Sequence, residues 1–173
     1  MKRFSLAMLA LLTCAGAQAA SEEVQMNLVT AQGVGQSVGS VKISETDKGL
    51  EFAPNLNALP PGEHGFHVHA KGNCEPAMKE GKPSAAEAAG GHLDPHKTGK
   101  HAGPEGEGHL GDLPVLVVNN DGKATDAVVA PRLKKLDEVK GKALMIHVGG
   151  DNMSDQPKPL GGGGARYACG VIK

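Results

Sequence analysis

The stretch VQMNLVTAQGVGQSVGSVKISETDKGLEF, residues 24–52, repeats its apolar residues at a period of two rather than 3.6. Alternate side chains of a β-strand project to the same face, so this pattern predicts strands at 24–28, 38–43 and 50–52. We expect the apolar residues of the first strand, Leu28 included, to face one way. The spacing of the second strand indicates an irregularity within it.

Similar short apolar segments continue along the chain, separated by Gly, Pro and Asn-Asp-Gly turn signals. About eight strands with regular turn signals predict an all-β fold, an antiparallel sandwich or barrel. Residues 132–140 repeat apolar side chains at spacing three and predict one or two helical turns. The further predicted strands are 65–70, 115–118, 127–130, 143–148 and 169–172.

Two segments, 71–113 and 149–166, lack a periodic apolar face and are rich in Gly and Pro. Structureless segments of this length inside a compact domain are usually functional loops or are held by something other than packing. The sequence therefore predicts a β-scaffold with two long functional loops.

The composition excludes some classes of function. The 173 residues include no Trp, one Tyr and three Phe, and Lys+Arg 18 nearly balances Asp+Glu 19. Single-stranded nucleic acids are bound by aromatic platforms in basic grooves, so no nucleic-acid partner is expected.

The N-terminus is typical of an export signal. Residues 1–3 are basic, 4–13 are uncharged and largely apolar, and Ala17-Gln18-Ala19 is a small-x-small cleavage site. We expect residues 1–19 to be removed, leaving 20–173 as a single exported domain. No later segment is long and apolar enough to predict a membrane span. An alternative makes Cys14 a lipid-anchored N-terminus.

Two cysteines, Cys74 and Cys169, remain in the mature chain. In an oxidising compartment a pair of thiols most simply forms one disulfide. The alternative is two unpaired buried cysteines.

Histidine is the residue type that points to chemistry. His67 and His69 lie two apart on a predicted strand, so both imidazoles can reach one ion, although a solvated pair is an equally ordinary interpretation. His147 lies on another predicted strand, where a lone histidine is more often a core residue. Three of the four histidines in the long loop, together with one carboxylate, form a tetrahedral zinc set, and a bound ion would order a loop that has little packing. The set is His92, His101, His109 and Asp112.

Four motifs together resemble one family. They are GFHVH at 65–69, GGHLDP at 90–95, GHLGDL at 108–113 and GGGGARYACGV at 161–171. These resemble the copper,zinc superoxide dismutases, and specifically their exported, periplasmic bacterial branch. The resemblance implies an eight-stranded Greek-key barrel with one copper ion and one zinc ion per subunit.

The resemblance also assigns ligands. It makes His92 the imidazolate that bridges the two ions and is protonated while the bridge is broken. In the family, the cupric ion oxidises one superoxide to O₂ and the cuprous ion reduces a second to H₂O₂. The implied copper ligands are His67, His69, His92 and His147, and the implied zinc ligands are His92, His101, His109 and Asp112.

Three further residues match family positions. Asp151 corresponds to the carboxylate that links a copper ligand to a zinc ligand, with a turn residue as the alternative. Arg166 corresponds to the arginine beside the open copper position, which attracts a small anion, with a solvated loop residue as the alternative. Lys158 is either a steering charge or ordinary surface. His64 is expected to be structural or exposed, and His96 competes with His101 as the third zinc histidine.

The resemblance implies dismutation of superoxide in the periplasm. The alternatives are a copper and zinc storage module without turnover, or an inactive relative with a structural role. Arg166 favours the enzyme, because metal storage needs no residue that guides an anion. Monomer and homodimer both stay open.

Overall fold

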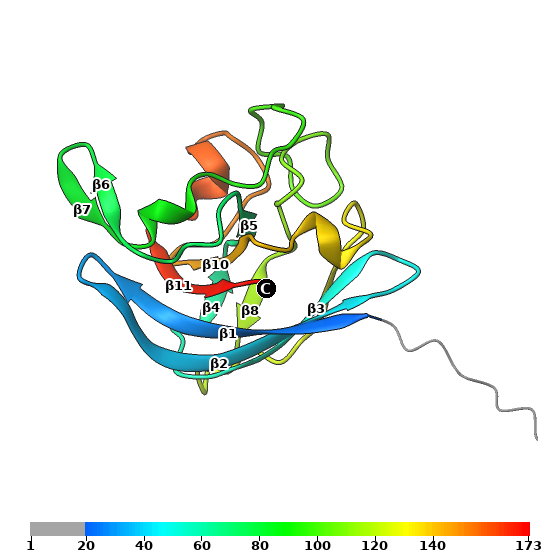
Figure 1. The fold of residues 1–173 in the computed structure, drawn as a ribbon, viewed down its shortest axis with the longest axis horizontal. Coiled ribbons are helices and arrows are strands. Elements are labelled where there is room, and N and C mark those ends of the chain that lie inside the picture. The colour runs from blue at the N-terminus through cyan, green and yellow to red at the C-terminus, as the bar shows by residue number, and fades with distance from the viewer. Residues whose placement is uncertain (1–19) are drawn as a thin grey trace, which may run out of the picture.

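The structure is a computed structural model that describes residues 20–173, so the predicted signal peptide, residues 1–19, lies outside the described residues. Over that range it contains strands of 3 to 13 residues and three single-turn 3-10 helices, and none of its helices is long and apolar enough to cross a membrane. Figure 1 shows the long first strands curling beneath a group of loops. The strands are β1 (Ser21–Thr30), β2 (Gly33–Glu45), β3 (Leu50–Leu56), β4 (Gly62–His64), β5 (Phe66–His69), β6 (Ala77–Lys79), β7 (Lys82–Ser84), β8 (Leu116–Val118), β9 (Val128–Ala130), β10 (Ala143–His147) and β11 (Arg166–Val171); the helical turns are η1 (Glu87–Ala89), η2 (Leu136–Glu138) and η3 (Pro159–Gly162).

Seven strands form one curled antiparallel sheet in the order β5-β10-β11-β1-β2-β3-β9. Neighbours such as β1 and β11, or β3 and β9, are far apart in the sequence, as in Greek-key connections. β4 pairs separately with β8, and β6 with β7. The predicted all-β antiparallel class is confirmed, and η2 lies within the predicted helical segment at 132–140.

Each predicted strand overlaps an observed one, but the count is higher than the predicted eight because β4, β6 and β7 were not predicted. The β6–β7 hairpin lies inside 71–113, so this loop is not wholly irregular. The hairpin turns at Glu80 and Gly81, both at positive φ, and its residues are mostly exposed. A short solvated hairpin needs no apolar alternation, so the sequence pattern does not reveal it.

The predicted irregularity in the second strand is a bulge. Met26 pairs with Gly39 and Asn27 with Ser37, which leaves Val38 without an opposite partner. A second register shift between Asn27 and Val29 places Val29 in the interior and leaves Leu28 only partly buried. The expectation that Leu28 faces the same way as Val24 and Met26 is confirmed, because Leu28 packs against the same core cluster. Val29 belongs instead to the separate apolar cluster around the two cysteines.

The interior lies between the curled sheet and the β4–β8 pair. Phe52 and Phe66 meet edge to face with ring centroids 5.9 Å apart, a favourable aromatic geometry in a core that is otherwise aliphatic. This core supports β5 and β10, whose buried ends carry histidines. The scaffold is therefore rigid where those side chains emerge.

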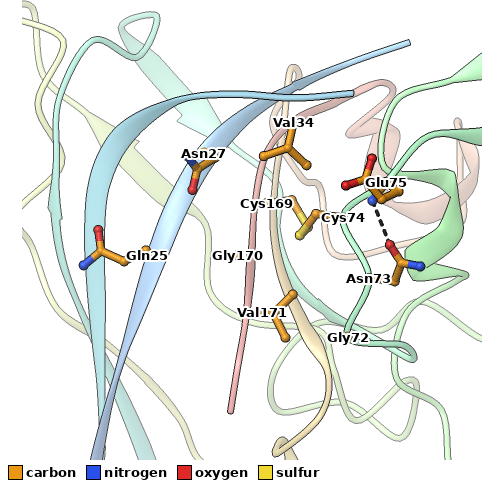
Figure 2. A pocket seen from close by; sticks show the side chains of 10 residues that line it. All are labelled: Gln25, Asn27, Val34, Gly72, Asn73, Cys74, Glu75, Cys169, Gly170 and Val171. Atoms are coloured by element: carbon orange, nitrogen blue, oxygen red, sulfur yellow. Dashed lines mark hydrogen bonds between the residues drawn. A yellow bond between two sulfur atoms is a disulfide. The ribbon is translucent and has the colours of Figure 1, made fainter. Parts of the chain in front are cut away.

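The predicted disulfide is present. Cys74 and Cys169 are joined across a sequence separation of 95 residues, which ties the loop after β5 to β11. Both cysteines are buried in a small apolar cluster that includes Ala86, Ala89 and Met145. A pocket of about 270 Å³ lies beside the bond, lined partly by β1 and β11, as Figure 2 shows.

Candidate metal centre

Three parts of the chain bring six histidines together. β5 supplies His67 and His69, and β10 supplies His147 from the neighbouring position in the sheet. The loop 71–113 brings the remaining three over the end of these strands. The rings pack closely, with centroids 4.0 Å apart for His67 and His92 and 5.5 Å apart for His69 and His147.

One group of four nitrogen donors is buried and compact. Within it, His69 Nδ1 donates to the Gly90 carbonyl at 2.8 Å, and His147 Nδ1 donates to the Gly164 carbonyl at 3.1 Å. Each ring is then left with a lone pair on Nε2, and these two atoms are 3.3 Å apart. Two lone pairs at that distance repel unless a cation lies between them. The donor atoms of the group lie within 4.8 Å of one another: His67, His69, His92 and His147.

His67 supplies an unpartnered nitrogen to this group. Its Nε2 donates to Asp151 Oδ2 at 2.7 Å, while its Nδ1 is buried and has no hydrogen-bond partner. A buried polar atom without a partner is costly. A metal ion bound at Nδ1 would remove that cost, so the donor set fits copper, for which imidazole is a suitable ligand.

A second group surrounds the carboxylate of Asp112. His92 Nδ1 lies 2.9 Å and His109 Nδ1 3.4 Å from Oδ1, and His101 Nδ1 lies 3.0 Å from Oδ2. The Nδ1 atoms of His101 and His109 are buried, yet neither is in hydrogen-bonding geometry. Ligands about 2.0 Å from a tetrahedral zinc ion lie about 3.3 Å from each other, so these separations fit a shared ion.

The compact version of this second group contains His67 in addition to His92, His101 and Asp112, and does not contain His109. His67 is close because its ring stacks on that of His92. Its Nε2, however, already donates to Asp151. His109 has a buried Nδ1 without a hydrogen-bond partner, 3.4 Å from Asp112 Oδ1, so this atom is available as a ligand.

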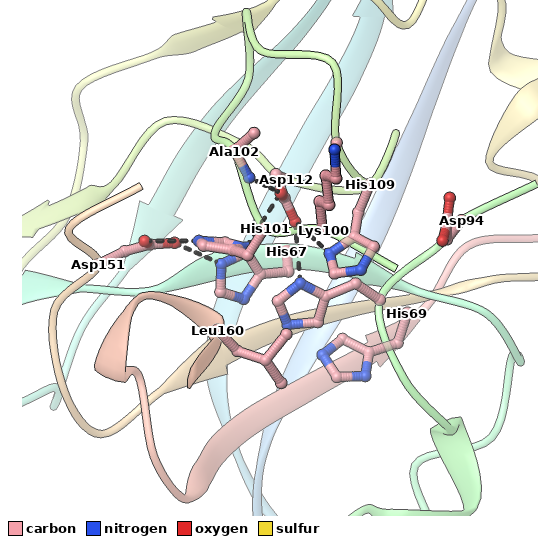
Figure 3. A network of polar contacts seen from close by, with 12 residues as sticks. His67, His69, Asp94, Lys100, His101, Ala102, His109, Asp112, Asp151 and Leu160 are labelled. Carbon is pink, nitrogen blue, oxygen red and sulfur yellow. Dashed lines mark hydrogen bonds and ion pairs between the residues drawn. The ribbon is translucent and has the colours of Figure 1, made fainter. Parts of the chain in front are cut away.

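Asp151 connects the two groups. Its Oδ2 accepts from His67 Nε2 and its Oδ1 accepts from His101 Nε2, both at 2.7 Å, as Figure 3 shows. These bonds fix the protonated nitrogen of each ring and direct Nδ1 toward the metal positions. Asp151 also accepts from the backbone N–H of Met153, so its own position is fixed.

Burial determines the charge of most of these rings. It lowers the pKa of His69 well below its usual value, that of His92 to about 4 and that of His147 to about 3. These rings are neutral at pH 7, and neutral imidazole is the form that binds a metal. Three of the four histidines in the first donor group therefore need not lose a proton before they bind an ion.

His101 behaves differently. Burial opposes its charged form, but the nearby carboxylates of Asp112 and Asp151 outweigh burial and raise the pKa of His101 to about 9. At the two carboxyl groups, His101 together with His92 beside Asp112 and His67 beside Asp151 outweighs burial and holds the pKa of each carboxyl well below its usual value. Without an ion, His101 in the second donor group carries one extra proton, which a bound ion would displace.

Arg166 begins β11 and is paired with His147 of β10. Its Nη1 donates to the Ala86 carbonyl at 2.6 Å, and its Nη2 donates to the Gly90 carbonyl at 2.5 Å. The Gly90 carbonyl is the one that also accepts from His69. Arg166 is thus held beside the copper-side histidines, and burial lowers the pKa of its guanidinium.

The remaining candidates lie outside the two groups. His64 is buried, with Nδ1 2.7 Å from the His147 carbonyl and Nε2 2.8 Å from the Pro60 carbonyl, so it is a structural residue. His96 is exposed, whereas His101 is inside the zinc-side group. Lys158 is exposed in the loop before η3.

Sequence reasoning missed the residues that hold Arg166. Glu87 of η1 places Oε2 3.3 Å from Arg166 Nη1, and the Ala86 and Gly90 carbonyls flank the same guanidinium. Backbone carbonyls leave no mark in a sequence. The only available signal was an acidic residue just before the GGH motif.

The fold and the paired donor groups define an all-β protein with a two-metal centre. The family model for copper/zinc superoxide dismutase (SODC) matches residues 37–172, and the chain belongs to that family. A curated Cu-Zn superoxide dismutase of Escherichia coli (strain K12) is 82% identical over 173 residues, covering 100% of both chains. The chain is accordingly an enzyme that dismutes superoxide to O₂ and H₂O₂, and its family uses copper and zinc.

Solved structures agree with this assignment. The Cu/Zn superoxide dismutase from Brucella abortus superposes with a TM-score of 0.88 at 57% identity, covering 89% of this chain and 100% of that one. The monomeric copper, zinc enzyme from Salmonella enterica superposes with a TM-score of 0.81 at 79% identity, with the same coverage. The storage-module alternative is not favoured.

Proposed function

We propose that each donor group holds one ion and that His92 belongs to both. The observation that carries this proposal is the convergence of buried, unpartnered nitrogens on two adjacent points, with His92 included in each compact group. Copper would be held by His67, His69, His92 and His147, and zinc by His92, His101, His109 and Asp112.

Copper supplies the redox chemistry when bound, because it can accept an electron from one superoxide and return it to a second, whereas zinc has no redox chemistry. The protein supplies the protons and the orientation. His92 Nδ1 faces Asp112, so Nε2 is the atom that can hold a proton near the copper-side histidines and give it to the reduced substrate. The Asp151 bridge keeps His67 and His101 in the tautomers that both ions require.

Arg166 receives the substrate. Of its five N–H donors, two are used by the Ala86 and Gly90 carbonyls, which leaves others to bind a small anion. A fixed guanidinium attracts and orients an anion at no further cost in side-chain entropy.

The proposal is tested with protein reconstituted with copper and zinc and assayed by pulse radiolysis. Arg166→Ala is expected to lower the rate constant about tenfold, as loss of electrostatic guidance does, while copper content stays unchanged. Arg166→Lys keeps the charge without the planar fork and is expected to be intermediate. Full metal content with wild-type turnover in Arg166→Ala would remove this role.

The bridging role of His92 has its own readout. His92→Ala is expected to abolish the spectroscopic coupling between the copper and zinc positions, measured with cobalt in place of zinc. An unchanged copper spectrum would contradict the bridge.

We further propose that the chain is exported to the periplasm, cleaved after Ala19 and monomeric. The basic start, apolar run and Ala17-Gln18-Ala19 site support the cleavage, and the monomeric state of the Salmonella enterica relative supports the last point. Mass spectrometry of the periplasmic fraction should give a chain that begins at Ala20. Light scattering should give the mass of one chain, and twice that mass would contradict the monomer.

A further inference from the structure

The helical turn η1 surrounds the guanidinium of Arg166 with three acceptors. Two are the neutral carbonyls of Ala86 and Gly90, and the third is the charged carboxylate of Glu87, with Oε2 3.3 Å from Nη1. The carbonyls alone would fix the orientation of the guanidinium. The carboxylate adds something that they do not, namely a full negative charge beside the group that receives an anion.

Glu87 is partly removed from water and held in place. Its side chain is 22% exposed, and that of Arg166 is 11% exposed. Ser84 Oγ of β7 donates to Glu87 Oε2 at 3.4 Å, and Lys79 Nζ of β6 lies 3.8 Å from the same oxygen. A charge that is held this close and is only partly exposed to water is screened less than a surface charge.

We propose that Glu87 is a positioning and specificity-determining residue. It holds the Nη1 edge of Arg166 and weakens the attraction of the site for anions according to their charge. This inference rests on the proposed role of Arg166.

The dependence on anion charge follows from electrostatics. The repulsion between Glu87 and an anion bound at Arg166 is proportional to the charge of that anion. If Glu87 lowers the affinity for a monoanion by a given factor, it therefore lowers the affinity for a dianion such as hydrogen phosphate by the square of that factor. Superoxide is a monoanion, so Glu87 favours it over multivalent anions that would otherwise occupy the guanidinium.

The test uses the copper- and zinc-loaded full enzyme. Azide binding is followed by the copper absorption spectrum, and phosphate binding by competition with azide. Glu87→Gln keeps the shape of the side chain and removes the charge. We expect about threefold tighter azide binding and about tenfold tighter phosphate binding, the order expected for one unit charge several ångströms from the anion in a polarisable site.

Two further variants separate charge from shape. Glu87→Asp keeps the charge and should leave both affinities within about twofold of wild type, by the same argument. Glu80→Gln removes one negative charge from the exposed hairpin tip, and no ion pair involves Glu80 among the described residues. It should leave the ratio of phosphate to azide affinity unchanged.

Three results would overturn the inference. They are unchanged affinities in Glu87→Gln, equal strengthening of azide and phosphate, or weaker azide binding with copper retained, which would indicate a purely structural role. A wild-type enzyme that holds copper and zinc but binds neither anion would instead overturn the proposed role of Arg166.

Discussion

At the residue scale, Asp151 shows how one side chain can connect two groups of metal-binding residue types. Asp151 is not itself in either compact donor group. Its two oxygens each accept a 2.7 Å hydrogen bond, one from each side of the centre. The loop 149–166 therefore orients rings that belong to β5 and to the loop 71–113.

Asp151→Asn tests this role. An asparagine has one acceptor oxygen, so either His67 or His101 loses its partner and can turn its Nδ1 away from the ion. Zinc affinity should fall about 10- to 100-fold, the usual effect of losing such a partner, as measured by competition with a chromogenic chelator. Asp126→Asn, an exposed position, is the control. Equal zinc affinity in the two variants would show that Asp151 is only a turn residue.

His101 leads to a second prediction at this scale. Its pKa of about 9 in the ion-free site means that the ring is protonated at pH 7, and zinc can bind only the deprotonated nitrogen. Zinc binding at pH 7 should therefore release about one proton, and release should vanish above about pH 9. Calorimetry in buffers of different ionisation enthalpy measures the proton count. No release at pH 7 would contradict a protonated His101.

The sequence motifs identified most of the candidate residues of this site, but they missed the residues that hold Arg166 in place. The GFHVH and GGHLDP motifs identify residues whose chemistry is in the side chain. Glu87 was not found, because its importance depends on where β11 places Arg166. The choice between His101 and His96 likewise depends on which one the loop turns inward.

At the element scale, the disulfide holds the part of the site that surrounds Arg166. Cys74 lies in the loop that leads to η1, and Cys169 lies in the same strand as Arg166. The bond therefore joins the strand that carries the guanidinium to the loop that carries its acceptors. Without the disulfide, no covalent bond holds Arg166 close to the carbonyls that it contacts.

A double variant, Cys74→Ser with Cys169→Ser, should lower the free energy of unfolding of the metal-free protein by about 2–4 kcal/mol. Denaturant titration measures that loss. With excess copper and zinc supplied, the rate of superoxide dismutation should still fall several-fold because Arg166 is no longer held. Wild-type turnover in the metal-saturated variant would show that the bond does not help to position Arg166.

Strands were predictable where one face is buried. The segments 24–28, 38–43 and 143–148 alternate or run apolar because they contact the core, and they correspond to β1, β2 and β10. β4, β6 and β7 are short and largely polar, so they carry no apolar signal, whereas the equally short β8 and β9 are apolar and were predicted. The bulge in β1–β2 left a signal only in the uneven spacing of its apolar residues.

At the scale of the whole molecule, the buried histidines make the metal-free protein sensitive to acid. His92 and His147 have lowered pKa values, about 4 and about 3, so the unfolded chain binds protons first as the pH falls below 6.5. The lowered pKa values of Asp112 and Asp151 add to this loss of stability once the pH falls below 3.8, the usual pKa of an aspartate. The raised pKa of His101 has the opposite effect on stability. Its contribution to the free energy of unfolding is complete below pH 6.5 and is lost as the pH rises through about 9.

The metal-free protein should therefore be most stable near neutral pH. Its free energy of unfolding should fall by several kcal/mol between pH 6.5 and pH 3, since the unfolded state binds more protons over that interval. Denaturant titrations at a series of pH values in the presence of a chelator give the curve. Equal stability at pH 4 and pH 6.5 would mean that these rings are not held neutral in the folded protein.

The carbonyl of Gly90 affects how well the site keeps its geometry during thermal motion. One oxygen accepts from His69 Nδ1 at 2.8 Å and from Arg166 Nη2 at 2.5 Å. His69 of the first donor group and the guanidinium of Arg166 thus take their positions from one shared oxygen atom. Thermal displacement of that peptide carries both in the same direction, so the spacing between them varies less than the position of either.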